Sequence, residues 1–417
     1  MVALGLIVLG CFPVISTAEQ DEPEALPNKS PGELHVPGNY TTIQLAIDAA
    51  LPGDTILVAV GTCDGFIVDG KTNLTIQSSS TVIVQGVQVV TTNYGDREAV
   101  VFVNDSENIV LEGLTIGPNT GQQTQKDYSV IYEHSSGEIN NCTISPDTVG
   151  GLNYVAIGVW DDSDITIDSC TIEDFGRVGV FFYNGCTAIV FNSTIIGQLY
   201  GVGKQVCYGI EVEAAAMANQ VTITGNEIYD CDKTFSPELK WGSSGILING
   251  WLEYGPQADS TVIMENNDIH NNYGGIYVVK GSSSYAHHNN IYDNREYGVE
   301  SAKAYDDTIA LFDAIRNWWG DSSGPSSAGN GAGDAISKNV DFNPWLLGPA
   351  PVFFAGAAPV KWAIEDVDSD GDMDFLFHFK TQDLVLDENS TKTTLTGFAY
   401  ILLAIEGEDS VKIVPKK

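Results

Sequence analysis

Hydrophobic and polar residues alternate in short runs that recur through the middle of the chain. Each run places a small or amide residue two positions before an apolar one, as in "INNCTI", "ITGNEI" and "MENNDI". Period-two alternation rich in β-branched residues, with Gly, Asn, Asp and Ser between the runs, predicts short strands rather than helices. Successive copies, 22 to 41 residues apart, fill this slot with Leu114, Cys142, Cys170, Ser193, Asn226, Asn267, Asn289 and Asn317.

A repeat of this length predicts a solenoid, in which each coil buries its inner face only against its neighbours. Coils of this size with a recurring inward Asn resemble the right-handed parallel β-helix proteins of the pectate-lyase-like superfamily, over residues ~37–345. The hand follows from that resemblance and from the general right-handedness of parallel crossovers. We therefore expect an all-β protein built on a right-handed, single-stranded parallel β-helix.

The recurring slot has a structural explanation. Amide side chains at the same turn of successive coils lie about 4.8 Å apart, so they can hydrogen-bond along the stack and to turn carbonyls. Cys142 and Cys170 fill the slot in adjacent coils, which permits either a disulfide or two stacked free thiols. We expect an Asn ladder at Asn226, Asn267, Asn289 and Asn317.

Both ends of the solenoid need closure, because open sheet edges promote aggregation. At the N-terminus we expect a helical cap, in which Thr41 and Gln44 have capping-box spacing. One face of that helix carries Ile43, Ala46, Ile47 and Ala50.

At the other end, "NWWGDSSGP" fits the pattern NWWG-x-x-x-GP and resembles the closing coil of secreted bacterial and archaeal β-helix proteins. Strand alternation from Asn317 directs Trp319 inward as a plug and Trp318 outward.

The first residues predict export. An apolar run over Val2–Gly10 precedes a small-residue cleavage site at Ser16–Ala18, and the run is too short to span a bilayer. "VLGC" resembles a lipobox, so a lipid anchor at Cys11 is a further expectation. We divide the chain into a signal peptide (1–18), a linker (19–36), the β-helix (37–348) and a small β-sandwich-like domain (349–417).

The chain carries 19 Lys and Arg against 55 Asp and Glu, a formal net charge of −36. This charge repels nucleic-acid phosphates and anionic lipids, so we expect neither as a partner. It suits a soluble secreted or cell-envelope protein and sites where Ca²⁺ neutralises carboxylates.

One acidic segment, "DVDSDGDMD", predicts a Ca²⁺ site in the C-terminal domain. It resembles the first half of an EF-hand loop, although Phe377 stands where that loop has its final glutamate. The alternative is a solvated acidic turn between two strands. The candidate ligands are Asp366, Asp368, Asp370, Asp372 and Asp374.

The second phrase of each coil, such as "YGIEV" or "GGIYV", gives the candidate binding face. Its inward residues are apolar, whereas the outward ones include aromatic rings and carboxylates, which stack on sugar rings and bond sugar hydroxyls. Long loops covering the rings are the alternative. The candidates for substrate binding are Trp160, Phe181, Tyr183, Glu211, Tyr277 and Glu300, with Glu213, Leu247 and Asn249 also outward.

Catalysis has two candidate arrangements. A Ca²⁺-assisted lyase needs a metal site and a base. The candidate metal ligands are Asp161, Asp162 and Asp164, which also fit a solvated turn, and the candidate bases are Arg177, Lys204 and Lys280. A hydrolase needs two carboxylates, available from Asp174, Glu211 and Glu213.

Two functional classes follow from these patterns. The first is a secreted or cell-envelope protein that binds polysaccharides or surface partners without catalysis. The second is a polysaccharide lyase or glycoside hydrolase acting on acidic glycans. A fold of this kind hosts both, so the fold cannot choose between them. Tyr229, His270 and Tyr292 share one outward position in three coils and predict a packed aromatic stack rather than a metal site.

Overall fold

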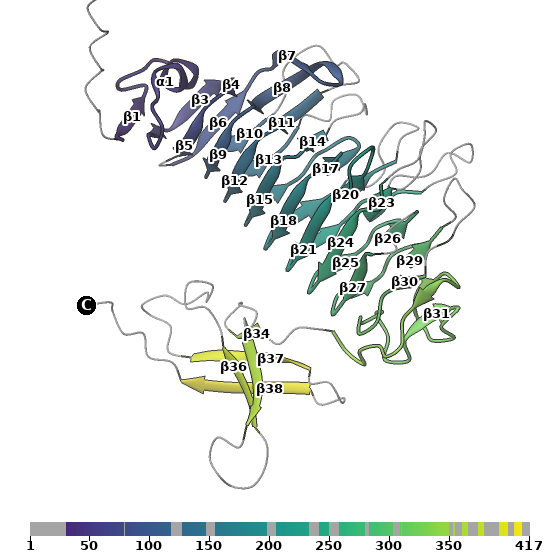
Figure 1. Ribbon diagram of the computed structural model, residues 1–417. Coiled ribbons are helices and arrows are strands. Elements are labelled where there is room, and N and C mark those ends of the chain that lie inside the picture. The colour runs from purple at the N-terminus through teal and green to yellow at the C-terminus, as the bar shows by residue number, and fades with distance from the viewer. Residues whose placement is uncertain are drawn as a thin grey trace, which may run out of the picture.

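The structure is a computed structural model in which the chain winds through three long parallel sheets, named A, B and C (Figure 1). Among the residues that the structure describes, five short strands follow the coiled body. The residues it describes are 31–78, 80–117, 127–146, 155–197, 206–232, 242–249, 258–279, 283–302, 309, 311–349 and the strands within 353–410.

Each coil from β8 to β28 contributes one strand to each sheet, in the order C, A, B along the chain. In the described residues, sheet A has 12 strands: β1 (Glu33–Val36), β2 (Thr55–Val58), β5 (Thr72–Ser78), β9 (Glu107–Glu112), β12 (Ser136–Asn140), β15 (Asp164–Asp168), β18 (Thr187–Phe191), β21 (Gln220–Thr224), β24 (Thr261–Glu265), β27 (Tyr285–His287), β30 (Phe312–Asp313) and β33 (Val340–Asp341). Because β1 pairs with β2, the β-helix begins at Glu33, inside the segment expected to be a linker.

Sheet B, over the same ranges, comprises β3 (Gly61–Asp64), β6 (Val82–Gln85), β10 (Thr115–Ile116), β13 (Thr143–Ile144), β16 (Thr171–Ile172), β19 (Thr194–Ile196), β22 (Glu227–Tyr229), β25 (Asp268–His270) and β28 (Asn290–Tyr292). Sheet C comprises β4 (Phe66–Asp69), β8 (Gly95–Asn104), β11 (Asp127–Glu133), β14 (Val155–Trp160), β17 (Val178–Tyr183), β20 (Tyr208–Glu213), β23 (Ser244–Asn249), β26 (Gly274–Val278), β29 (Tyr297–Ser301), β32 (Gly333–Ile336) and β31 (Pro325–Ser327). Strand β7 (Gln88–Thr92) pairs antiparallel with β8 and forms a hairpin at the edge of sheet C.

The turn from sheet A to sheet B explains the recurring sequence phrase. The residue before each ladder position adopts the left-handed conformation, as at Asn141 (φ 52°), Gly225 (φ 68°) and Asn266 (φ 57°). Asn and Gly tolerate this conformation best, which is why they dominate the position. The same conformation occurs at Ser169, His288 and Arg316, where the fold imposes it on less suitable residues.

The predicted Asn ladder is confirmed. The Oδ1 of Asn267 accepts from the backbone N and from Nδ2 of Asn226, both at 3.0 Å. Asn289 accepts from Asn267 in the same way at 2.9 Å, and Asn317 accepts from Asn289. Each Nδ2 also donates to a buried carbonyl, such as that of Ile223. The ladder thereby satisfies polar groups that would otherwise be costly to bury.

A second ladder lies where sheet B turns toward sheet C, and the sequence analysis missed it. Cys231 N donates to Asn272 Oδ1 at 2.9 Å, and Asn272 N donates to Asn294 Oδ1 at 3.1 Å. Asn294 N and Nδ2 then donate to Oδ2 of Asp334. The signal was an amide shortly before the Gly of each sheet C strand, in "NNYGG" and "DNREYG".

The interior of the coils forms one continuous apolar core. At its C-terminal end Trp319 is 0% exposed, as expected for a plug, while Trp318 is half-buried. Coiling continues past Asn317, since β33 extends sheet A and β32 and β31 extend sheet C. Cys142 and Cys170 are free thiols.

Helix α1 (Ile43–Ala49) packs against the first strands, with Ile43, Ala46 and Ile47 buried. Its N-cap is Thr42, whose side chain accepts from Leu45 N at 3.2 Å, so the expected Thr41 capping box is wrong. The Gln44 side chain instead bonds the backbone of Ile67, which fastens the helix to β4. That helix α1 closes the N-terminal end of the β-helix remains a prediction.

After the coiled body, β34 (Phe353–Phe354), β37 (Lys392–Phe398) and β38 (Ala404–Ser410) form an antiparallel sheet, and β35 (Lys361–Glu365) pairs antiparallel with β36 (Asp374–His378). A β-sandwich-like domain remains a prediction. Asp374 begins β36, but the remaining candidate Ca²⁺ ligands lie outside the described residues: Asp366, Asp368, Asp370 and Asp372. The signal peptide 1–18 and Cys11 lie outside them too.

Candidate functional site

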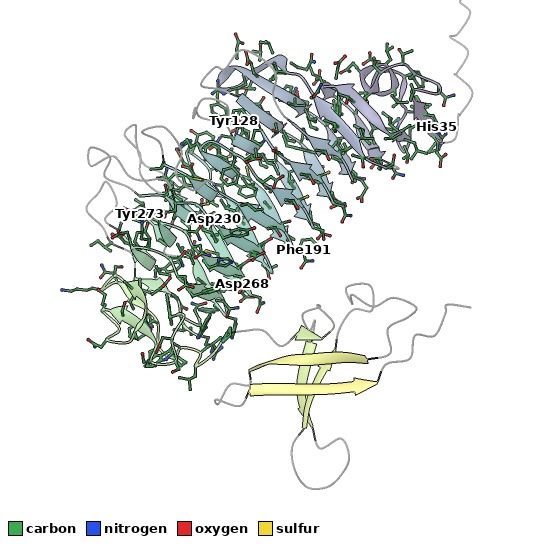
Figure 2. The ribbon with its side chains drawn as sticks, turned by 180° about the vertical axis from the view of Figure 1, so that it is seen from behind. His35, Tyr128, Phe191, Asp230, Asp268 and Tyr273 are labelled. Carbon is green, nitrogen blue, oxygen red and sulfur yellow. The ribbon has the colours of Figure 1, made fainter. Side chains whose placement is uncertain are left out.

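The outward residues of sheet C lie in rows along the axis of the β-helix, because parallel pairing stacks equivalent positions. One row runs through Phe181, Glu211, Leu247, Tyr277 and Glu300. The adjacent row runs through Glu133, Trp160, Tyr183, Glu213 and Asn249. The residues predicted for substrate binding thus lie in these two rows on the outer face of sheet C. In Figure 2, Tyr128 in β11 and Tyr273, which directly precedes β26, mark two well-separated points along the length of this sheet.

Trp160 differs from expectation because its ring is not open to solvent. It is 2% exposed and meets Tyr94, from the β7–β8 turn, edge to face at 5.7 Å. Tyr128 covers a second side at 5.0 Å. Trp160 is thus part of an apolar layer on the outside of sheet C, and its ring cannot stack on a sugar in this arrangement.

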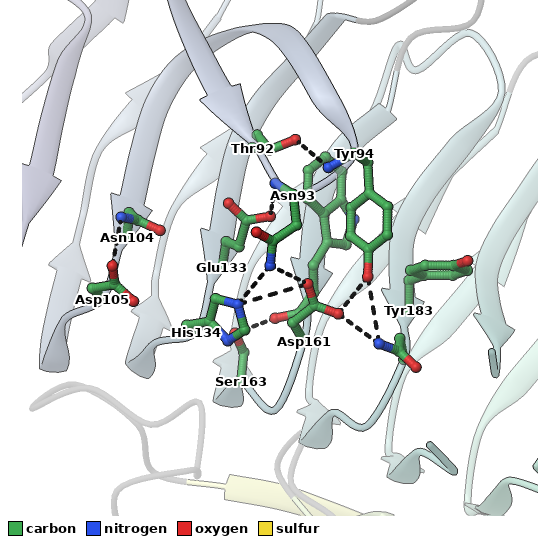
Figure 3. A network of polar contacts seen from close by, with 12 residues as sticks. Thr92, Asn93, Tyr94, Asn104, Asp105, Glu133, His134, Asp161, Ser163 and Tyr183 are labelled. Atoms are coloured by element: carbon green, nitrogen blue, oxygen red, sulfur yellow. Dashed lines mark hydrogen bonds and ion pairs between the residues drawn. The ribbon is translucent and has the colours of Figure 1, made fainter. Parts of the chain in front are cut away.

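The β7–β8 turn is held down by a polar network around Asp161 (Figure 3). The Tyr94 hydroxyl donates a short hydrogen bond to Asp161, and Asn184 Nδ2 donates to the same oxygen at 2.7 Å. Asn93 Nδ2 donates to the other carboxylate oxygen at 3.0 Å, near His134. Burial and the bond to Asp161 raise the pKa of Tyr94, so the phenol stays protonated.

Asp161 is therefore neither a solvated turn residue nor an open metal ligand, because it is buried and its oxygens are engaged. Asp162 and Asp164 are exposed. Within the described ranges, no three His, Cys, Asp or Glu side chains converge where they could hold a metal ion.

Arg177 and Glu211 form an ion pair between adjacent coils of sheet C. Arg177 Nη2 lies 3.1 Å from Glu211 Oε2 and 3.3 Å from Oε1. Glu211 is 0% exposed, whereas the Arg177 side chain is 33% exposed. The Glu211 carboxylate raises the pKa of Arg177, so the guanidinium holds its proton firmly.

Glu213 lies beside this ion pair in the next row. Burial, followed by repulsion from Glu211, raises its pKa to about 8. Asn249 joins the two carboxylates, since its Nδ2 lies 3.1 Å from Glu213 and 3.4 Å from Glu211. At neutral pH this site therefore holds a protonated Glu213 next to the Arg177–Glu211 pair.

Solvent reaches part of this face. Phe181 and Tyr183 are half-buried, with ring centroids 5.7 Å apart, and they adjoin the partly exposed Arg177, Glu213 and Asn249. We call these five residues the sheet C patch. It combines two accessible rings with a cation, an acid and an amide, whereas Leu247 and Tyr277 farther along the row are buried.

The other candidates lie elsewhere. Asp174 is exposed at the turn after β16 and accepts from Ser145 Oγ at 3.3 Å, so the structure does not bring it to Glu211. Tyr277 and Glu300 line a pocket of about 380 Å³ near the C-terminal end of sheet C. Lys204 and Lys280 lie outside the described residues.

The aromatic stack predicted on sheet B is confirmed. His270 stacks on Tyr229 at 5.2 Å and on Tyr292 at 4.9 Å, and Trp318 continues the stack beside Tyr292. Because the rings cover one another's faces, the stack is a packing feature of the outer surface of sheet B.

A family model described as "Right handed beta helix region" matches residues 98–253 and 155–313, which together span more than half of the 417-residue chain. The chain belongs to the right-handed β-helix family. The predicted fold class is thereby confirmed together with its hand. No curated protein matches the chain.

Several solved structures resemble this β-helix protein. An alginate lyase from Paenibacillus sp. is 16% identical over 74% of this chain and 99% of its own, with a TM-score of 0.43. The A-module of a mannuronan C-5 epimerase from Azotobacter vinelandii is 14% identical over 73% and 90%, with a TM-score of 0.39. A pectin methylesterase from Erwinia chrysanthemi is 11% identical over 75% and 92%, with a TM-score of 0.33. In the described part of the chain, no helix is long and apolar enough to cross a membrane.

Proposed function

We propose that this protein binds a polysaccharide through the sheet C patch. The observation that carries the proposal is the pair of half-buried rings, Phe181 and Tyr183, beside the polar groups of Arg177, Glu213 and Asn249. Rings stack on pyranose faces, while amide and carboxyl groups bond hydroxyls at the ring edge. Few but well-placed polar groups within an apolar surface are typical of ligand sites.

The ion pair contributes to the selectivity of this site. One third of the Arg177 side chain is exposed, so part of its guanidinium can bond a second acceptor while Glu211 neutralises its charge. A protonated Glu213 does not repel a uronate carboxylate at neutral pH. The patch therefore accommodates acidic as well as neutral sugars.

The proposal also covers where the protein resides and its binding of Ca²⁺. We place the protein outside the cell or in its envelope, where polysaccharides occur, with a lipid anchor at Cys11 as part of the proposal. Ca²⁺ bound by Asp366, Asp368, Asp370, Asp372 and Asp374 would make the C-terminal segment rigid rather than take part in catalysis.

The test is binding of the full chain to a panel of neutral and acidic polysaccharides, measured by calorimetry. Tyr183→Ala should weaken binding at least tenfold, because it removes a stacking ring. The matched control is Tyr229→Ala on sheet B, which should leave the dissociation constant unchanged. Equal effects of the two substitutions, or no binding to any glycan, would refute the proposal.

A second candidate function, glycan cleavage, is favoured by the raised pKa of Glu213. A carboxylic acid that stays protonated at neutral pH can protonate a glycosidic oxygen, and an ionised carboxylate nearby complements it. Arg177 fits the role of a lyase base poorly, because its pKa is raised. If the site cleaves glycans, Glu213→Gln should abolish the release of reducing ends while binding persists. Unchanged product release in this variant would exclude that role.

A further inference from the structure

A pocket of about 380 Å³ lies at the C-terminal end of sheet C, where β26 and β29 approach β31 and β32. Its volume falls in the range of small-molecule sites in proteins. It is separate from the sheet C patch, which β17, β20 and β23 provide. The residues of its lining that matter here are Tyr273, Tyr277, Tyr297, Glu296, Glu300 and Ser337.

Three tyrosines make the pocket aromatic. The ring centroid of Tyr297 lies 5.9 Å from that of Tyr277 and 6.3 Å from that of Tyr273. Tyr297 lies directly over Gly274, where an added Cβ would come within 2.1 Å of its ring. The glycine thus provides the space for this ring in the pocket wall.

Tyr297 brings a buried, unpartnered hydroxyl to the wall of the pocket. The residue is 9% exposed, and its hydroxyl has no hydrogen-bond partner among the described residues. A buried hydroxyl without a partner costs about 1–3 kcal/mol. A polar ligand in the pocket would supply the missing bond.

The charge of the pocket selects the kind of ligand. Glu296 and Glu300 contribute two carboxylates, and no Lys or Arg lines the pocket within the described residues. The guanidinium of Arg295, which lies on the Tyr273 ring at 4.8 Å, is paired with Asp232 at 2.6 Å. Burial raises the pKa of Glu300, because the pocket wall withdraws its carboxyl group from water.

We propose that this pocket binds an amino sugar that carries a free ammonium group. The ammonium would lie between the two carboxylates and near the tyrosine rings, which attract cations through their π faces. The hydroxyls of Tyr297 and Ser337 would bond those of the sugar. The inference rests on the proposed function only in taking the ligand to be a sugar.

This ligand class is distinct from that of the patch. A uronate would bring a third negative charge to Glu296 and Glu300, which costs binding energy in a partly buried site. N-acetylation would remove the positive charge and enlarge the group. The pocket should therefore reject acidic sugars and prefer the free amine over its acetylated form.

The test uses the full chain and glucosamine oligosaccharides of two to four units, titrated by calorimetry. The free-amine form should bind at least tenfold more tightly than the N-acetylated form, and oligouronates should not compete with it. Glu300→Gln should weaken binding about tenfold. Glu296→Gln should act in the same direction, and because Glu296 is exposed this variant should fold normally.

The matched control is Glu227→Gln, which removes a carboxylate from sheet B and should leave affinity unchanged. Equal binding of the acetylated and free forms, unchanged affinity in both pocket variants, or no binding of the free amine would overturn the inference. Tyr183→Ala distinguishes the two proposals, since it should weaken polysaccharide binding at the patch and leave glucosamine binding intact. Glucosamine binding without polysaccharide binding would refute the proposed function alone.

Discussion

The ladders inside the coils and the outer face of sheet C are built from the same repeats. They differ in whether equivalent positions carry the same residue in successive coils. In the ladder, Asn226, Asn267 and Asn289 make the same contact in successive coils, since the backbone N of each donates to Oδ1 of the next Asn. On the outer face, equivalent positions carry the partly exposed Tyr183, Glu213 and Asn249. Repetition marks residues that hold the fold, whereas variation at one position marks residues available for recognition.

The largest effect should come from the end of the core. Trp319→Ala removes a fully buried ring and should destabilise the protein by about 3–5 kcal/mol, because the closed end cannot refill the cavity. Trp318→Ala, on the half-buried neighbour, should cost less than about 1.5 kcal/mol. Denaturant unfolding midpoints measure both. Equal losses would contradict the assignment of Trp319 as the plug.

Next in size should be a break in the Asn ladder. Asn267→Ala leaves the backbone N of Asn226 and the carbonyl of Ile223 without partners in the core. We expect a loss of about 2–6 kcal/mol, at about 1–3 kcal/mol for each of the two unsatisfied groups. Asn266→Gly, at the adjacent exposed position, keeps the left-handed turn and should change stability by less than about 0.5 kcal/mol. A small loss at Asn267 would mean that the ladder contributes little.

A smaller, pH-dependent effect should appear at Glu213. Its pKa is about 8 in the folded protein and about 4.5 for the free side chain, so the native state holds the extra proton between these values. Stability should therefore fall as pH rises through that window. Glu213→Gln should match the wild type below pH 4.5 and exceed it above pH 8, by about 1–2 kcal/mol after allowance for solvent screening.

Thermal unfolding at pH 4, 7 and 9 measures the effect at Glu213. The acidic group of Asp334, whose pKa burial raises to about 7, is present in both proteins and cancels in the comparison. A difference that does not grow with pH would show that Glu213 is ionised in the native state.

The fold could be predicted because its signals are local and repeated. The Asn slot, the period-two alternation and the inward Trp319 each follow from neighbours in sequence. The second ladder at Asn272 and Asn294 has the same chemistry and a constant offset from Asn267 and Asn289, but Cys231 fills the equivalent position in the preceding coil, so the amide does not recur there.

The site could be predicted only in part. Alternation placed Phe181, Tyr183 and Glu213 on one face, and pairing across coils brought Arg177 to Glu211. The burial of Trp160 depends on Tyr94, which lies 66 residues earlier in the sequence and carries no repeat signal. The pocket could not be predicted for the same reason, namely that it depends on a contact between distant residues. The ring of Tyr297 occupies space that Gly274 leaves in another coil.

The most direct test of the central claim is hydroxyl-radical footprinting of the whole protein with and without a bound polysaccharide. If recognition lies on sheet C, Phe181 and Tyr183 should lose reactivity on binding, while Tyr229 and Tyr292 on sheet B should keep theirs. Protection of Tyr229 and Tyr292 with no change at Phe181 and Tyr183 would contradict the account.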